Sequence, residues 1–392
     1  MLSQILAITG VNLKSIPERW GPSLVIIVGL AGVVAVFTAL LAMGEGMNAT
    51  LADTGRSDNA LVLRGGSDSE LASSLSRDEA NLIKLAPGIR KGADGKPLAS
   101  AELIVIAELF KIGETVNGSN LTVRGVEPTA FALRPALKIV EGRQFKPGLR
   151  ELVVGRGVSQ EFDDAQIGKT LRMRGSDWTV VGVFESRDAY ESELWTDAEV
   201  AQSSFGRNGY SSVLAGVQDE KAIKSLDAAL KADQRLNLAV LSQQEYFSAQ
   251  SKQFRTLIAW AGGLVTVLMA IGAIFAALNS MFAAIATRAK EIATLRAIGF
   301  GGFPVLVSVM IEATALALAG GVLGALIAYA LFNNLSVSTS GANFTQVVFA
   351  FKVTPELVGI GLAISVAVGL IGGLIPAAMA ARQSVTTALR SA

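Results

Sequence analysis

The fold of this chain is decided by a stretch near its N-terminus, residues 21–44 (GPSLVIIVGLAGVVAVFTALLAMG), which contains no charged residue. Three further charge-free runs follow, Thr256–Thr287, Ala313–Phe351 and Leu357–Ala381. Each run exceeds the roughly 20 residues that a helix needs to cross a hydrocarbon core of about 30 Å. A soluble domain of this size rarely contains four helices that are apolar on every side. The sequence therefore predicts four transmembrane helices.

The charged residues lie mainly between the first and second of these runs. Residues 44–255 contain 26 Lys/Arg and 29 Asp/Glu in 212 positions, a fraction typical of soluble domains, whereas the other 180 residues contain only 8 and 4. The expected fold is a membrane protein of four transmembrane α-helices with one large α+β domain inserted between spans 1 and 2. Residue patterns in that domain predict strands at 62–63, 103–110, 121–126, 151–154, 170–174 and 178–184, a turn at 175–177, and helices at 77–85 and 220–231.

The orientation in the membrane follows from the basic residues that flank the spans. The positive-inside rule counts only short segments, and here Lys352 is the single basic residue on one side. Both termini are therefore expected in the cytoplasm and the large domain on the extracytoplasmic side of the membrane. The basic residues assigned to the cytoplasmic side are Lys14, Arg19, Arg288, Lys290, Arg296, Arg382 and Arg390.

The N-terminal segment predicts a short amphipathic helix that lies in the cytoplasmic interface. Its apolar residues recur every three to four positions, Asn12 lies off that stripe, and Pro17 should end or bend the helix. A plain charged flank is the alternative. For the first span the alternative is a cleaved signal peptide, but its apolar core exceeds the roughly 7–15 residues of such a signal. The stripe consists of Leu2, Leu6, Leu13, Ile16 and Trp20.

The second charge-free run is longer than a membrane requires, and residues 243–255 before it are also compatible with a helix. We therefore expect one long helix that begins as a stalk outside the membrane. The predicted segments in chain order are a cytoplasmic amphipathic helix (1–22), a first span (23–43), a large extracytoplasmic domain (44–246), a stalk with the second span (247–286), a cytoplasmic helix (287–301), a third span (302–332), a short extracytoplasmic loop (333–354), a fourth span (355–380) and a cytoplasmic tail (381–392).

Composition argues against catalysis by this chain. It contains neither Cys nor His, which excludes disulfides, Cys zinc sites, thiolate nucleophiles and His-based catalytic triads. No metal or cofactor site is expected, and the net charge of +1 gives no sign of nucleic-acid binding. Acidic residues occur in two groups that lack calcium-loop spacing, and both are interpreted as solvated surface. These groups are Asp163-Asp164 and Glu185, Glu193, Asp197 and Glu199.

Two features of the third and fourth spans are unusual. Glu312 is an ionisable group about 12 Å along the helix from Pro304, where an unpaired charge is costly and a function is the default hypothesis. The favoured alternative is a buried structural bond to Ser308, to Thr314 or to a neighbouring helix. Small-residue spacings that let helices approach closely occur in both spans, at Gly320 and Gly324 with Ala328, and at Gly369 and Gly373.

One block resembles a known family. The predicted cytoplasmic helix reads TRAKEIATLRAIGF (287–300), and the last span ends in PAAMAARQSVTTALR (376–390). Together with the order of one span, a large domain and three spans, these blocks resemble the FtsX-like permease domain of the MacB superfamily of ABC transporters. The matching positions in the first block are Arg288, Lys290, Glu291, Ile292, Leu295, Arg296, Ala297 and Gly299.

The resemblance implies that residues 287–301 form a coupling helix seated on a cytoplasmic ATPase, and that the large domain is a MacB-like periplasmic core domain. Independently, an exposed charged face of Arg288, Lys290, Glu291 and Arg296 beside an apolar face of Ile292, Leu295 and Ile298 suits docking in a partner's groove. The residues expected to contact or support the ATPase are Arg288, Lys290, Glu291, Leu295, Arg296 and Gly299.

The chain contains no G-x-x-x-x-G-K-[ST] motif, so ATP and Mg²⁺ are expected on a separate ATPase subunit. The family further implies a second permease copy, as a homodimer or a related pair, and leaves open a periplasmic adaptor. The expected function is substrate efflux by a MacB-type transporter. Two alternatives remain: release of lipoproteins, and FtsX-like signalling to periplasmic cell-wall hydrolases without transport.

Overall fold

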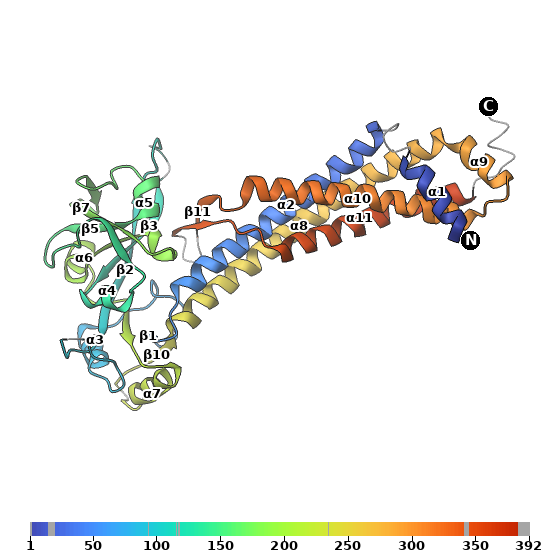
Figure 1. The fold of residues 1–392 in the computed structure, drawn as a ribbon. Helices are drawn as coiled ribbons and strands as arrows, with labels where there is room; N and C mark the ends of the chain where they lie inside the picture. The colour runs from blue at the N-terminus through green and yellow to red at the C-terminus, as the bar shows by residue number, and fades with distance from the viewer. Residues whose placement is uncertain are drawn as a thin grey trace. The chain divides into compact units, whose positions relative to one another are not determined.

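The computed structural model describes residues 2–14, 20–92, 94–114, 116, 118–233, 235–340 and 345–382. Contacts within the chain divide it into two compact units (Figure 1). The helical unit comprises residues 1–45, 256–335 and 351–392, and the α/β unit comprises residues 46–255 and 336–350. Pro17 and the tail from residue 383 onward, for which the sequence predicts a helix end and a cytoplasmic segment, lie outside the described residues.

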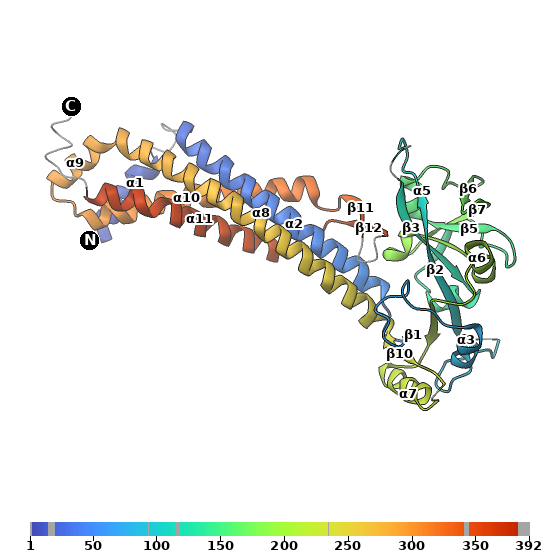
Figure 2. The same cartoon turned by 180° about the vertical axis from the view of Figure 1, so that it is seen from behind.

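Four long helices form most of the helical unit, and each is long and apolar enough to cross a membrane. This finding confirms the four predicted spans. In Figures 1 and 2 the last two of these helices lie side by side. The first two have 35 and 45 residues, because both continue past the charge-free runs into the α/β unit. The four helices are α2 (Trp20–Thr54), α8 (Gln243–Thr287), α10 (Gly302–Phe332) and α11 (Pro355–Arg382).

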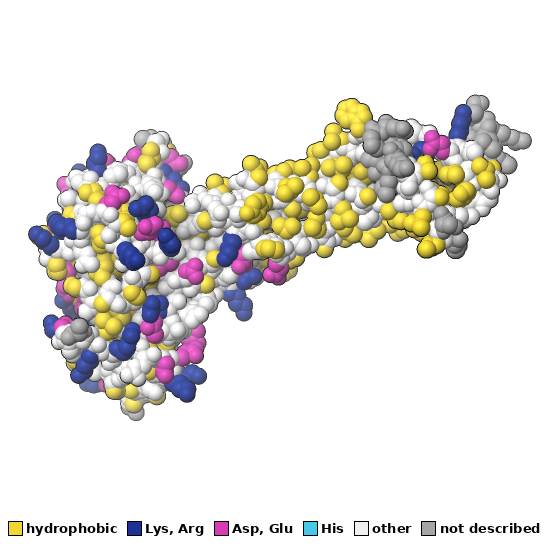
Figure 3. Space-filling view, in the orientation of Figure 1, with side chains coloured by type: hydrophobic (Ala, Val, Ile, Leu, Met, Phe, Trp, Pro, Cys, Tyr) yellow, Lys and Arg dark blue, Asp and Glu magenta, His cyan; other side chains and the backbone are white. Residues whose placement is uncertain are grey.

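The outer surface of the helical unit is apolar. On α8, the side chains of Trp260, Leu264 and Phe275 are 79%, 65% and 63% exposed. Figure 3 shows hydrophobic side chains spread over the long helices, whereas Lys, Arg, Asp and Glu side chains gather on the α/β unit. So much exposed apolar surface is unfavourable in water and favourable in a bilayer. The chain is therefore a multi-pass membrane protein.

The α/β unit is built on a ten-stranded, mostly antiparallel sheet in the order β10-β1-β9-β2-β3-β8-β5-β7-β4, with β6 paired to β7. Only β3–β8 and β5–β7 are parallel among the strand pairs of the described residues. The strands are β1 (Asn59–Arg64), β2 (Ala99–Leu109), β3 (Ser119–Val126), β4 (Lys138–Gly142), β5 (Glu151–Gly155), β6 (Thr170–Met173), β7 (Ser176–Glu185), β8 (Glu193–Asp197), β9 (Ser212–Gly216) and β10 (Leu238–Ser242).

Short helices pack on this sheet over a core that includes the fully buried Trp178, Trp195 and Phe184. Side-chain caps fix where several of them begin, because Ser76, Asp197 and Asp219 each accept a backbone N–H of the first turn. Helices and antiparallel strands in one domain confirm the α+β class. The helices are α3 (Arg77–Lys84), α4 (Thr129–Leu133), α5 (Arg156–Glu161), α6 (Ala198–Phe205), α7 (Glu220–Lys231) and the 3₁₀ turn η2 (Ala189–Ser192).

The structure differs from the sequence prediction in two connections, and the strands β4, β8, β9 and β10 of the sheet were not predicted. The β6–β7 hairpin turns at Arg174 and Gly175, whose φ values are +50° and +74°, and not over residues 175–177. Positive φ at both central residues gives the twist that a two-residue hairpin needs. The loop between the third and fourth spans contains an antiparallel hairpin, β11 (Ser336–Ser340) and β12 (Gln346–Ala350), which was not predicted.

The interpretation of Glu193 and Asp197 as solvated surface is wrong. Glu193 is 8% exposed and accepts hydrogen bonds at 2.7 and 2.8 Å from the Arg124 guanidinium. Asp197 is 7% exposed and caps α6 through the backbone N–H of Val200 at 3.0 Å. Both carboxylates can be buried because each has a strong hydrogen-bond donor within the domain. Asp163 and Asp164 are exposed, as expected.

Candidate functional site

The block predicted as the coupling helix forms helix α9 (Ala289–Ala297) and the turn after it. Lys290 and Glu291 are exposed on this helix, whereas Leu295 and Arg296 are half-buried. Gly299 follows with φ +109°, a backbone conformation that residues with a Cβ rarely adopt, so glycine suits the turn that ends the helix. Lys290 and Glu291 are therefore the charged side chains of this block that a partner could reach most easily.

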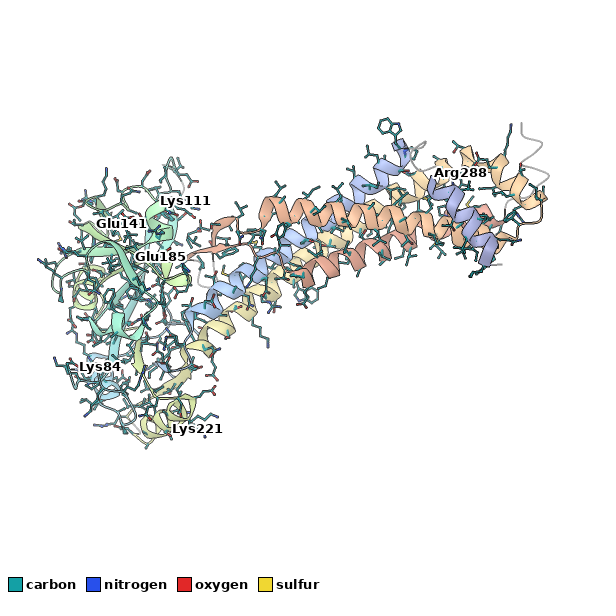
Figure 4. The ribbon with its side chains drawn as sticks, viewed as in Figure 1. Lys84, Lys111, Glu141, Glu185, Lys221 and Arg288 are labelled. Carbon is teal, nitrogen blue, oxygen red and sulfur yellow. The ribbon has the colours of Figure 1, made fainter. Side chains whose placement is uncertain are left out.

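Arg288, which directly precedes α9, is not on this surface. Its side chain is buried, and its Nη1 atom lies 3.1 Å from Asn12 Oδ1 and 3.2 Å from Glu312 Oε2. Asn12 belongs to helix α1 (Leu2–Lys14) and Glu312 to α10. Figure 4 shows Arg288 beside α1, at the point where α8 gives way to α9. One guanidinium thus connects three helical elements of this unit.

The prediction that Arg288 belongs to an exposed charged face is therefore wrong. Its guanidinium can be buried because the Glu312 carboxylate pairs with it and Asn12 accepts a further hydrogen bond. For Glu312 the favoured prediction was a buried structural bond, and the structure gives it such a bond, but to Arg288. The Ser308 hydroxyl accepts instead from Asn12 Nδ2 at 2.7 Å, and the Thr314 hydroxyl donates within its own helix.

Sequence reasoning missed the role of Asn12. It was placed off the apolar stripe of the N-terminal helix, yet its side chain is only 9% exposed. A polar side chain off the stripe looks solvated when the helix is considered alone. It becomes a buried hydrogen-bonding group once α1 packs on α10, which the contacts of the helical unit show.

A cavity of about 410 Å³ lies between α1, α8, α9 and α10. Asn12, Arg288 and Glu312 contribute its polar wall, and the rest is mainly aliphatic. The cavity thus borders the buried polar side chains that connect the start of α9 with α1 and α10. The aliphatic lining includes Ile8, Met281, Ile285, Ile292, Leu295 and Val305.

The predicted small-residue positions lie at helix contacts. A Cβ atom on Gly320 would come within 2.8 Å of the Ile27 carbonyl oxygen, and one on Gly324 would collide with the carbonyl oxygen of Ala31, so both glycines face α2. On α11, a Cβ on Gly369 would collide with Ala317, and one on Gly373 would lie 2.7 Å from the Cβ of Ala313. These glycines let the backbones approach closely. The four positions therefore join α10 to both α2 and α11.

Nothing in the described parts of the chain forms a metal centre. No group of three or more acidic side chains is arranged there to hold a cation.

Two family models match the sequence, and together they cover most of it. The MacB-like periplasmic core domain matches residues 23–233, and the FtsX-like permease C-terminal domain matches residues 263–385. The first match alone spans more than half of the chain. The second includes α9, α10 and α11.

The related proteins are permeases by name. The chain is 24% identical to the "uncharacterized ABC transporter permease YvrN" of Bacillus subtilis over 391 residues, which is 93% of each protein. It is also 24% identical to the macrolide export ATP-binding/permease protein MacB of Neisseria gonorrhoeae, over 84% of this chain and 55% of that protein. Among solved structures, the extracellular domain of YknZ from Gram-positive bacteria covers 47% of this chain at 20% identity, with a TM-score of 0.37.

The family models agree with the four spanning helices and with the domain inserted between the first two of them. The chain belongs to the MacB/FtsX-like family of ABC transporter permeases.

Proposed function

We propose that this chain is the permease subunit of a MacB-type exporter in a bacterial inner membrane, in which a separate cytoplasmic ATPase drives movement of the periplasmic α/β unit and thereby efflux of a substrate. The observation that carries the proposal is α9. It joins the second and third spanning helices, and it presents Lys290 and Glu291 to solvent beside the buried Arg288. A force on α9 would therefore reach both flanking helices.

ATP and Mg²⁺ belong, in this proposal, to the partner. The 392 residues contain no phosphate-binding loop motif, and the described residues contain no acidic metal cluster. YvrN, which matches this chain over 93% of both sequences, is named a permease alone. MacB, of which the chain matches 55%, is named an ATP-binding protein and permease together. The comparison supports a division of labour between two polypeptides.

A second copy of the permease completes the proposed transporter, with both termini of each copy in the cytoplasm. ABC ATPases work in pairs, so a homodimer gives each ATPase its own α9. In this proposal a periplasmic adaptor would pass the substrate onward. Co-purification from the native membrane would test whether the permease binds such an adaptor.

The test is ATPase docking with matched charge reversals. Glu291→Lys should leave the full chain folded in the membrane and reduce its co-purification with the ATPase about tenfold or more, because a like charge replaces an attractive one at the interface. Glu356→Lys reverses another exposed carboxylate, at the start of α11, and should have no effect. Equal co-purification of both variants would refute the assignment of α9.

Transport itself needs a second measurement. Reconstituted vesicles that contain the permease and its ATPase should show substrate flux that depends on ATP. Hydrolysis and conformational change without flux of any candidate substrate would instead support the signalling alternative, and capture of lipidated proteins would support lipoprotein release.

A further inference from the structure

One short turn of the α/β unit is hydrogen-bonded to α2, to α8 and to the hairpin between α10 and α11. This turn is η2, four residues between β7 and β8. The Thr54 hydroxyl, at the end of α2, accepts the backbone N–H of Ala189 at 2.9 Å. The Gln243 amide, at the start of α8, donates to the Tyr190 hydroxyl at 2.7 Å.

The third bond comes from the hairpin between α10 and α11. The backbone N–H of Val348 in β12 donates to the Ser192 hydroxyl at 2.7 Å. Ala189, Tyr190 and Ser192 thus bind α2, α8 and β12 respectively. Ser192 and Gln243 are 2% and 1% exposed, so water does not readily replace these partners.

The turn is held firmly on its other side. Asp188 caps it by accepting the backbone N–H of Tyr190 at 3.0 Å. A Cβ on Gly155, which precedes α5, would collide with the backbone of Glu191, so the glycine lets α5 rest directly on the turn. The sequence Gly155-Arg-Gly157, which resembles part of a dinucleotide-binding fingerprint, thus has a packing role here: a Cβ on Gly157 would lie 3.0 Å from the Val348 side chain.

Inside the domain, η2 leads to a buried ion cluster. The ring of Tyr190 lies 4.7 Å from the Arg134 guanidinium and 5.1 Å from that of Arg124, within the range of cation–π attraction. Arg124 in turn pairs with Glu193, the first residue of β8, at 2.7 Å. The cluster also contains Glu70 and Glu102, and both are buried.

A second path runs from α8 to the same arginine. The Tyr246 hydroxyl, in the first turn of α8, accepts the backbone N–H of Glu70 at 3.0 Å, and the Glu70 carboxylate bonds to Arg124. Burial disfavours the charged form of Glu102, but the guanidinium groups of Arg134 and Arg124 favour this form more strongly. The pKa of Glu102 is therefore lowered. Glu102 is therefore ionised at neutral pH, and the close packing of this buried cluster leaves little room for Tyr190 to move without moving its neighbours.

We propose that η2 is the receiving element of the α/β unit, where displacements of α2, α8 and the β11–β12 hairpin are combined and passed through Tyr190 to Arg124, Arg134 and strand β8. Thr54, Tyr190, Ser192 and Gln243 are positioning residues in this scheme. The inference rests on the proposed function, because it needs an ATP-driven movement of the helices to receive.

The experiment uses the full chain with its ATPase in lipid nanodiscs. Because the chain contains no Cys, cysteines introduced at exposed Ala249 on α8 and Glu141 on β4 (Figure 4) can carry spin labels specifically. Label-to-label distance distributions are recorded without nucleotide and with ATP. Each distribution is divided into the distance population that dominates without nucleotide and the one that dominates with ATP. The ratio of these two populations reports the movement of the sheet relative to the stalk part of α8.

The decisive variants are Gln243→Ala and Tyr190→Phe, each with a matched control. Gln244→Ala removes an exposed side chain of the same type, and Tyr210→Phe removes a hydroxyl that bonds to Glu199 and not to α8. The two test variants should reduce the ATP-dependent change in the population ratio about 2-fold to 30-fold. Mutations along packed networks change coupling free energies by amounts that correspond to these factors. The nucleotide-free distribution and the ATPase rate should stay unchanged, which a merely structural defect would not allow.

The two ways of failing are distinguishable. An ATP-dependent shift that persists undiminished in Gln243→Ala and Tyr190→Phe would overturn the role of η2 and leave the proposed function intact. A wild-type transporter whose labels do not respond to ATP would overturn the proposed function, and the role of η2 with it.

Discussion

The guanidinium of Arg288 lies 3.2 Å from the carboxylate of Glu312, and both side chains are buried in the helical unit. The pair links the residue before α9 to the middle of α10, and Asn12 adds helix α1 to the same group. The charge that precedes α9 thus holds the helices of this unit together. Its neighbours Lys290 and Glu291 remain available to a partner.

Removal of one member of this pair should destabilise the chain strongly. Arg288→Met or Glu312→Met leaves an uncompensated buried charge, which costs about 3–5 kcal/mol. The double variant should lose much less than the sum of the two, because no charge is then left alone. Thermal unfolding of the full chain in detergent measures all three variants. Lys290→Met, at the neighbouring exposed position, should change stability by less than about 0.5 kcal/mol, and additive losses in the cycle would contradict the pairing.

The contact of Gly324 with α2 predicts a sharp difference between two glycines. Gly324→Ala should destabilise the helical unit by about 1–3 kcal/mol, because the new methyl group collides with the Ala31 carbonyl and forces the helices apart. Gly359→Ala, on α11, has no heavy atom within 4 Å of the added Cβ and should be neutral. Unfolding midpoints of the two purified variants provide the comparison. Equal midpoints would show that α10 does not rest on α2 at this residue.

Asp188 predicts a pH dependence of stability. Burial raises the pKa of Asp188 to about 6, although hydrogen bonds from Ser186 and Tyr190 oppose this effect. The folded pKa exceeds the unfolded value of 3.8, so the contribution of Asp188 to stability is largest below about pH 4 and is lost as the pH rises to about 6. The loss is at most about 3 kcal/mol.

Asp188→Asn keeps an oxygen that can accept both hydrogen bonds but removes the ionisation. The variant should therefore be more stable than the wild type at pH 7.5 and similar to it at pH 4, measured by urea unfolding of the full chain. Asp177→Asn, at an exposed position, serves as the control. If the wild type were instead the more stable protein at pH 7.5, burial of the Asp188 carboxylate would not be destabilising.

The orientation of the chain can be tested by thiol labelling, since no native Cys interferes. Lys221 on α7 and Lys290 on α9 are both exposed. In cells with a permeabilised outer membrane, Lys221→Cys should react with a membrane-impermeant maleimide, and Lys290→Cys should react only after the inner membrane is lysed. Labelling of Lys290→Cys before lysis would reverse the proposed topology.

The sequence predicts the spans well because hydrophobicity over some 20 residues is a local property. The third predicted span, 302–332, has the same bounds as α10. The hairpin β11–β12 was missed, since all of it lies within the charge-free run that ends at Phe351 and its strands have only five residues each. Strands as short as these, one of them composed mainly of Ser and Thr, give no separate signal beside a spanning helix.

The burial of Arg288 could not be predicted for a different reason. Helical periodicity shows which side chains share a face, but not which distant helix will cover it. Asn12 is 276 residues from Arg288 in the sequence, and Glu312 lies on the next helix. The same limit applies to η2, whose bonds to Thr54 and Val348 span 135 and 156 residues.

The arrangement of η2 has a mechanical consequence. Thr54, Gln243 and Val348 bind residues of a single turn that is only four residues long. A displacement shared by the three partners carries the turn along as a rigid body and leaves its internal geometry unchanged. Only a displacement of one partner against the other two bends it. The turn therefore passes the common motion of its three partners on to Tyr190, whereas a motion of one partner alone is opposed by the bonds to the other two.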